Sequence, residues 1–265
     1  MKMEQDFTKN YYAHLAAIHG NDPKMSMRDQ YIREQENQFF RRSLQTLGQA
    51  KKLKVLDLGC GNGHLIKYLS ECFSDQEIEF YGLEYSPELF NICQQEHGHF
   101  LLGDARIKNT FEDGLFDIIL SQRMIINILK LKEQKQTLNN IFFWLKPEGY
   151  YLCSESFREP LHNLSIACQE MSFPEIRPSK HNLFLWRKNF ESFMTDFGFH
   201  KQRPVVAENS LSTHFYMTRV IHRLIRPRDG KKNPKYFKNF FHQALEPDIG
   251  DFSPILFYQW KKLIN

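Results

Sequence analysis

From about residue 53 onward, short apolar runs alternate with longer segments whose apolar positions recur at helical spacing. Runs of this length are typical of buried strands, and the longer segments have the pattern of helices. The predicted strands are 53–58, 79–84, 99–103, 117–121 and 150–155, and the predicted helices are 65–73, 87–95 and 133–145. Such alternation builds a parallel sheet with right-handed crossovers and helices on both faces. We therefore expect an α/β fold with ligands bound beyond the carboxyl ends of the strands.

The amino-terminal segment, residues 1–50, is polar and aromatic with few β-branched residues. Within it, 30–47 has the apolar spacing of a helix. Since this segment precedes the first strand, we expect it to form a helical cap over the ligand site, ahead of a domain that spans 51–265.

The carboxy-terminal third has a less regular pattern. A helix is predicted at 188–197, a short strand at 201–206 and the last strand at 255–261. Between them, 211–245 is expected to be a mostly helical insertion, interrupted by a turn cluster at 226–230.

Composition excludes several classes of protein. A chain of 265 residues suits one large core, and its apolar runs are far shorter than the roughly 20 residues that cross a bilayer. No apolar stretch follows a basic start, so no secretory signal is expected. The five cysteines are odd in number and form no Cys-x-x-Cys pair. We expect a cytoplasmic protein without integral membrane association, disulfide framework or metal site.

The net charge of +4 is unevenly distributed. From residue 201 to the end, 12 Lys and Arg face 5 Asp and Glu, which leaves an acidic surplus in residues 1–200. A basic segment of this kind binds an anionic substrate, RNA or a lipid surface in some proteins and is only a solvated face in others. The solvated face is the simpler interpretation.

The strand at 53–58 runs directly into a glycine-rich turn and then a helix. Its glycines at 59, 61 and 63 allow a sharp bend and let a ligand approach the backbone, while the following helix directs free amides at that ligand. A dinucleotide fingerprint would have glycine where His64 stands, and a P-loop would have Lys followed by Ser or Thr after Gly63. Asp57 would repel a pyrophosphate but attract an ammonium or sulfonium group. The turn therefore favours a cationic cofactor.

The segment 55–63 resembles the first motif of the class I S-adenosylmethionine (SAM) methyltransferases, a Rossmann-like fold with sheet order 3-2-1-4-5-7-6. Segments 80–84, 101–105, 116–121 and 145–152 resemble its later strands in the right order. By this resemblance Glu84 binds the ribose hydroxyls and Asp104 the adenine amine, with SAM as cofactor and S-adenosylhomocysteine (SAH) as product. The cofactor-binding residues expected in the core of the fold are Asp57, Gly59, Cys60, Gly61, Glu84, Tyr85, Asp104, Ala105 and Ser121.

The segment 26–36 is similar to one that precedes the glycine motif in bacterial methyltransferases of surface-polysaccharide pathways. Arg28 is a candidate to bind the methionine carboxylate, and Tyr31 a candidate to close the sulfonium face. A capped helix start with surface charges is an equal alternative.

Three further residues are candidates on the acceptor side. Arg123 follows the fourth strand, where an arginine can bind a phosphate or carboxylate of the substrate, or be structural. Glu155 ends the fifth strand. It is a candidate general base or substrate anchor, and the alternative is that it caps the next segment. His181, in a loop on the ligand side of the sheet, is the preferred general base, although most single loop histidines are not catalytic. The Asn-Pro-Pro-Tyr of nucleobase amine methylases is absent after the fourth strand, which disfavours DNA bases as acceptors.

We expect an enzyme of class EC 2.1.1 that methylates a hydroxyl or amine of a small polar metabolite, anionic or sugar-bearing. The resemblance of 26–36 and of 181–184 to polysaccharide-pathway enzymes favours a sugar, nucleotide-sugar or glycan unit of bacterial glycan biosynthesis. The alternatives are an RNA methyltransferase that uses the basic carboxy-terminal third and a SAM-binding scaffold without turnover. Nucleic acid is the less favoured partner.

Overall fold

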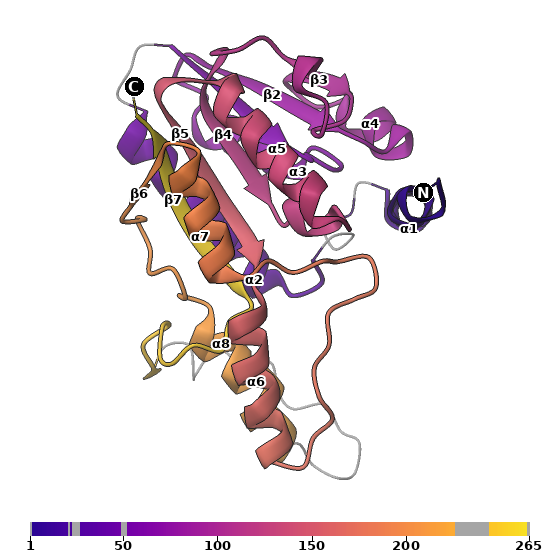
Figure 1. Cartoon of the computed structure of the whole chain (residues 1–265), viewed down its shortest axis with the longest axis vertical. Helices are drawn as coiled ribbons and strands as arrows, with labels where there is room; N and C mark the ends of the chain where they lie inside the picture. Colours follow the sequence, from indigo (N-terminus) through magenta and orange to yellow (C-terminus); the bar gives the residue numbers. More distant parts are fainter. Residues whose placement is uncertain (1, 21, 23–26, 49–51, 226–243, 264–265) are drawn as a thin grey trace.

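A single twisted sheet of seven strands forms the centre of the molecule (Figure 1). The computed structural model describes residues 2–20, 22, 27–48, 52–225 and 244–263. The strands are β1 (Leu53–Leu58), β2 (Ile78–Glu84), β3 (His99–Leu102), β4 (Phe116–Gln122), β5 (Leu145–Ser156), β6 (Phe199–Gln202) and β7 (Ile255–Lys262). Their order across the sheet is β3-β2-β1-β4-β5-β7-β6, as the sequence predicts.

Strands β1 to β5 are parallel, and only β7 runs against its neighbours, β5 and β6. The register brings Asp57 of β1 opposite Gly82 of β2 and Leu120 of β4. The carboxyl ends of β1, β2 and β4 therefore lie at one edge of the sheet, where the order reverses direction between β1 and β4. That edge is where open α/β sheets bind ligands.

Helices cover both faces of the sheet. One apolar core joins α2 (Gln30–Leu47), α3 (His64–Cys72) and α6 (Arg158–Glu170) to one face, and a second joins α5 (Leu131–Trp144) and α7 (Arg187–Asp196) to the other. The other helical segments are α1 (Lys2–His19), α4 (Pro87–Cys93), η2 (Lys108–Thr110), η3 (Ile125–Asn127), α8 (Ser212–Tyr216), η4 (Met217–Ile221) and α9 (His222–Ile225). In Figure 1, α1 lies beside α4, while α6 and α8 form a lobe that projects beyond the carboxyl end of β5.

The sequence patterns locate most elements within a few residues, with two exceptions. Strand β6 is Phe199–Gln202 rather than 201–206, because Pro204 has no amide hydrogen for the ladder and 203–206 leave the sheet. Helix α6 is absent from the predicted elements. In the predicted insertion at 211–245, residues 212–225 are helical, and 226–243, including the turn cluster, lie outside the described residues.

Among the helices that the structure describes, none combines the length and the apolar character needed to cross a bilayer.

Candidate functional site

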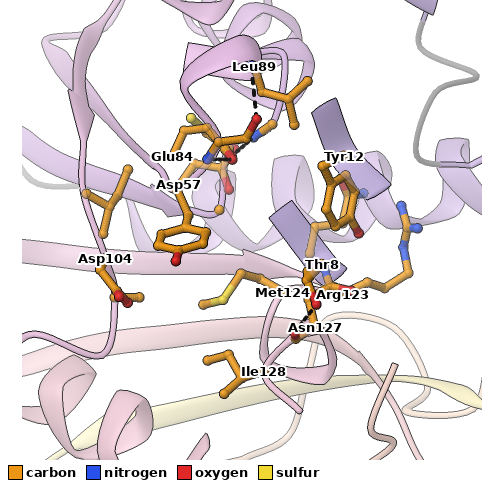
Figure 2. Close-up of a pocket in the computed structure, with 18 of the residues that line it drawn as sticks. Thr8, Tyr12, Asp57, Glu84, Leu89, Asp104, Arg123, Met124, Asn127 and Ile128 are labelled. Atoms are coloured by element: carbon orange, nitrogen blue, oxygen red, sulfur yellow. Dashed lines mark hydrogen bonds between the residues drawn. The ribbon is translucent and has the colours of Figure 1, made fainter. Parts of the chain in front are cut away.

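A pocket lies at the carboxyl ends of β1, β2, β3 and β4, and α1, which we call its roof, borders it with Thr8 and Tyr12 (Figure 2). Its floor is the glycine turn after β1, one wall is formed by the segments after β2 and β3, and the opposite wall by the loop between β4 and α5. Helices α1 and α2 contribute further lining side chains.

Backbone geometry explains why glycine is needed in the turn. Gly59, Gly61 and Gly63 have φ values of +73°, +58° and +79°, which side chains disfavour. A Cβ atom at Gly59 would lie 2.3 Å from Cγ of Met124, a clash that would displace the wall of the pocket. The Gly59 amide also donates to the carbonyl of Leu83 over 2.8 Å, which ties the turn to β2.

The carboxylate of Glu84 joins the end of β2 to this turn. Its Oε2 accepts from the Gly61 amide and its Oε1 from the Ser86 amide, both over 2.8 Å. Burial raises the pKa of Glu84, and the backbone amides that it accepts from oppose that shift. Since each carboxylate oxygen has two lone pairs, Glu84 keeps acceptor capacity on the side that faces the pocket (Figure 2).

Asp57 and Cys60 lie at the floor of the pocket. Burial, and then the nearby charge of Glu84, raise the pKa of Asp57 to about 7. A cation bound beside it would favour its charged form. The thiol of Cys60 is buried 3.9 Å from Sγ of Cys93, and this contact together with burial raises its pKa well above the usual value.

Asp104 follows β3 and is held by an arginine that the sequence patterns did not single out. Arg106 Nε donates to both oxygens of Asp104 over 2.8 and 3.1 Å, and its Nη1 donates to Glu133 over 2.9 Å. The guanidinium lies 5.2 Å from the ring centroid of Tyr85. The Ala105 carbonyl accepts from the Asn140 amide, so the segment after β3 is fixed from several sides.

The loop between β4 and α5 brings a charged network to the opposite wall. Arg123 Nε donates to Glu36 of α2 over 2.9 Å, and Gln122 Nε2 donates to the same carboxylate over 3.2 Å. Glu36 is fully buried and also accepts from the Ser154 hydroxyl. A single glutamate therefore anchors α2 to the ends of both β4 and β5.

Helix α1 contributes Thr8, Lys9 and Tyr12 to the roof of the pocket. The Thr8 hydroxyl donates to the Asn127 carbonyl over 3.5 Å, and the Tyr12 phenol hydrogen-bonds the Asn127 side chain. Burial raises the pKa of Tyr12 to about 12, so the phenol keeps its proton at neutral pH. Helix α1 thus contacts the β4 loop directly.

Helix α2 contributes Arg33, which is only 9% exposed and donates to the Met27 carbonyl over 2.9 Å. Burial, and then repulsion by Arg123, lower its pKa to about 10. The nearby charges of Glu36 and Asp22 oppose this shift, and the Arg33 guanidinium offers hydrogen-bond donors to an anionic group at this end of the pocket.

Five of the predicted residues do not line the pocket. Arg28 is exposed beside Asp29, which caps the start of α2. Tyr31 stacks on His214 at 4.6 Å, and His181 stacks on Tyr11 of α1 at 3.9 Å. The other two residues, Ser121 and Glu155, are fully buried beneath the β4 loop and hydrogen-bonded to each other.

Within the residues that the structure describes, no three histidine, cysteine or acidic side chains come together as a group able to hold a metal ion.

Comparison with known proteins gives these features a family context. Residues 55–149 match the family model described as a methyltransferase domain. Phosphoethanolamine N-methyltransferase of Triticum aestivum is 31% identical over 40% of this chain and 21% of its own length. A Drosophila melanogaster tRNA N(3)-methylcytidine methyltransferase is 23% identical over 57% of this chain and 50% of its own. The chain thus spans half or less of these curated relatives.

Solved structures share the fold over most of the chain. A Galdieria sulphuraria protein assigned as a sarcosine dimethylglycine methyltransferase has a TM-score of 0.58 and 17% identity, over 97% of this chain and 98% of its own. Magnesium protoporphyrin IX methyltransferase from Synechocystis with bound SAH has a TM-score of 0.55 and 13% identity, over 87% of this chain and 83% of its own.

The sheet order and these structural matches confirm the Rossmann-like methyltransferase fold, and residues 55–149 match a methyltransferase domain.

Proposed function

We propose that this chain is a SAM-dependent methyltransferase that methylates a hydroxyl or amine of a small polar metabolite. The observation that carries the proposal is the roofed pocket at the carboxyl edge of the sheet, where acidic strand ends face a glycine turn. A pocket covered by a helix suits a small acceptor, because the reacting atoms must be aligned and water excluded.

The residues present fit SAM in charge and position. Glu84 has acceptor capacity for ribose hydroxyls, and Asp104 for the exocyclic amine of adenine. Asp57 is a buried carboxyl group with a raised pKa and no ion pair among the described residues, and a cationic ligand beside it would favour its charged form. For the methionine carboxylate we propose Arg33 rather than Arg28, because Arg33 is buried and lines the pocket.

When bound, SAM supplies a methyl group on a sulfonium, which reacts by in-line displacement. The protein's part is to orient the acceptor and to exclude water. Met124 and Tyr12 border the space above Gly59, and Arg123 with Asn127 supplies polar groups beside it (Figure 2). We propose that the acceptor binds beside these polar groups, next to Met124.

Two observations favour different chemical classes of acceptor, and an experiment can distinguish them. The segment 26–36 favours a sugar or nucleotide-sugar, whereas the plant relatives favour a small phosphorylated amine. A general base assists methylation of a hydroxyl, and we propose His181 for that role; its ring stacks on Tyr11 and lies outside the pocket lining in this structure. His181→Phe keeps the ring stack and removes the base, so it should abolish hydroxyl methylation and leave amine methylation intact.

The test of the proposal combines binding and turnover. Calorimetric titration of SAH should show saturable binding to the purified chain. Incubation with SAM and metabolite extract, followed by mass spectrometry, should show a species heavier by one methyl group. SAH binding without any methylated product would favour the non-catalytic scaffold, and the lack of both would refute the proposal.

A second candidate is methylation of RNA. It is favoured by the tRNA methyltransferase relative and by the basic surplus after residue 201. Salt-dependent binding of mixed RNA would support it, because phosphate contacts release counterions. A flat RNA titration at low salt would remove it.

A further inference from the structure

The loop from Gln122 to Asn127 has an unusual backbone for a segment that forms a pocket wall. Arg123 has a φ of +55°, a left-handed conformation that is strained for a side chain other than glycine. Such a residue costs of order 1 kcal/mol or more and persists only when its surroundings hold it. Four residues of this loop line the pocket, so its conformation decides the shape of the acceptor side.

A buried carboxylate from the neighbouring strand holds this loop. Oε1 of Glu155 accepts from the amides of Met124 and Ile125, both over 3.0 Å, and from the Ser121 hydroxyl over 2.9 Å. These amides start η3, so Glu155 acts as a cap supplied from β5 rather than from the helix itself. In addition, the Arg123 amide donates to the Ser154 carbonyl over 2.7 Å.

The position that Glu155 fixes matters to the pocket because of Met124. The side chain of Met124 occupies the space that a Cβ at Gly59 would need, directly above the glycine turn. At the end of η3, the Asn127 side chain donates to the Arg123 carbonyl over 3.1 Å, and the Asn127 carbonyl accepts from Thr8 of α1. A shift of the two capped amides would therefore move the wall that faces the reacting methyl group.

We propose that Glu155 is a positioning residue for methyl transfer, which fixes Met124 and Asn127 by capping η3 without contacting the ligands. This proposal rests on the proposed function, because it assigns a role in that same pocket. It predicts that loss of the carboxylate lowers turnover while the affinity for SAH is kept, since the nucleoside contacts lie on β2 and β3.

The environment of Glu155 makes this cap sensitive to pH. Burial raises the pKa of Glu155 to about 7, against the loop amides and the Ser121 hydroxyl that stabilise its charged form. The titratable groups that face it are Tyr151 and Cys153 of its own strand, both with pKa values raised well above normal and thus neutral. Its Oε2 has no hydrogen-bond partner among the described residues. Protonation below about pH 7 would therefore weaken the cap.

The experiment follows the Met124 methyl group by NMR in protein that carries carbon-13 methionine methyls. The Met124 resonance is assigned with Met124→Leu, and the exposed Met171 serves as internal reference. In the wild type the Met124 resonance should titrate with a midpoint near pH 7. Glu155→Gln should abolish this titration, whereas Asp57→Asn, which removes the other carboxyl with a pKa of about 7, should leave it.

Turnover and binding complete the test. At saturating SAM, Glu155→Gln should lower turnover about tenfold and should remove the decrease of turnover at acidic pH. The calorimetric Kd for SAH should stay within about twofold of wild type. Ser121→Ala removes one donor to the carboxylate and should move the Met124 midpoint to higher pH, which keeps the proposal testable if Glu155→Gln does not fold. Glu159→Gln is the control, because Glu159 accepts from the Arg187 amide away from the pocket.

The outcomes separate the two proposals. A Met124 titration that survives in Glu155→Gln, or that keeps its midpoint in Ser121→Ala, would overturn the role of Glu155. A wild type that shows the titration but binds no SAH would instead refute the proposed function and leave the capping role standing.

Discussion

The two walls of the pocket are built in different ways. The nucleoside wall, formed by the turns after β1, β2 and β3, consists of residues that are close in sequence to a strand end, such as Gly59, Glu84 and Asp104. The acceptor wall is assembled from side chains distant in sequence, as in the pairing of Glu36 with Arg123 and of Glu155 with Met124. The first wall follows from local rules of strand, turn and helix, whereas the second exists only after the chain has folded.

This difference predicts that changes in the nucleoside wall act mainly on cofactor affinity and changes in the acceptor wall mainly on turnover.

The largest effect on the nucleoside wall should come from Gly59→Ala. A Cβ there would lie 2.3 Å from Met124 Cγ, in a backbone with a φ of +73°. We expect SAH affinity to fall more than about a hundredfold by calorimetry, because both strain and displacement of Met124 oppose the bound shape. Gly114→Ala is the matched control, with a φ of +67° and open space around it, and should leave affinity unchanged. Equal losses in both variants would remove the close-approach argument.

Glu84→Ala should rank second. It removes a carboxylate that organises the Gly61 and Ser86 amides and that we expect to accept from the ribose, at a cost of about 1–3 kcal/mol in SAH affinity. Glu79→Ala, at the opposite end of the same strand, loses a surface pair with Lys52 and a hydrogen bond from the Tyr81 hydroxyl, both away from the pocket, and should bind SAH as the wild type does. Undiminished affinity of Glu84→Ala in calorimetry would refute the ribose assignment.

A third comparison concerns two arginines near the start of α2. Arg33→Ala should weaken SAH binding about tenfold, as expected for loss of one charge-assisted contact to the carboxylate. Arg28→Ala should have no effect, because Arg28 is exposed outside the pocket. The reverse result would restore Arg28 as the carboxylate ligand.

The pH dependence of SAM binding should reveal Asp57. Its pKa of about 7 in the free protein means that its charge is lost as pH falls through 7, so the affinity for the cationic SAM should decline there. Asp57→Asn should bind SAM more weakly and without this slope.

Stability should change with pH in the opposite sense. Because the folded pKa of Asp57 is raised above its unfolded value of 3.8, its contribution to stability is lost as pH rises from about 4 to 7. The free Asp57→Asn protein should therefore be more stable than the wild type at pH 8 in urea denaturation. A less stable variant with an unchanged SAM pH profile would contradict the role of Asp57 as a strained, ligand-facing carboxylate.

The smallest effect should follow Tyr31→Phe. The Tyr31 ring stacks on His214 outside the pocket, and phenylalanine keeps that contact. We expect turnover within about twofold of wild type, because the substitution removes one hydroxyl group and keeps the ring contact. A strong loss of turnover at unchanged SAH affinity would instead support the sulfonium role expected from the sequence.

The sequence predicts the nucleoside wall of the pocket better than the acceptor wall. Glycine spacing and strand-end acids locate the nucleoside wall, because they are local requirements of one turn type and one sheet edge. The pairing of Arg106 with Asp104 does not follow from the sequence pattern, because the direction of the arginine side chain depends on the folded turn after β3. Sequence pattern alone could not distinguish Arg33 from Arg28. Arg33 lies in α2 and is buried, whereas Arg28 precedes α2 and is exposed. The burial of α2 depends on strand ends that are more than eighty residues away in sequence.

The central claim is that an adenosyl group binds between Glu84 and Asp104, with its sulfur over Gly59. A crystal structure of the chain with SAH tests it most directly. The ribose hydroxyls should lie within hydrogen-bond distance of Glu84, the adenine amine should face Asp104, and the sulfur should lie beside Met124. Density for the nucleoside at any other place on the molecule, or none in the pocket at saturating SAH, would contradict the account.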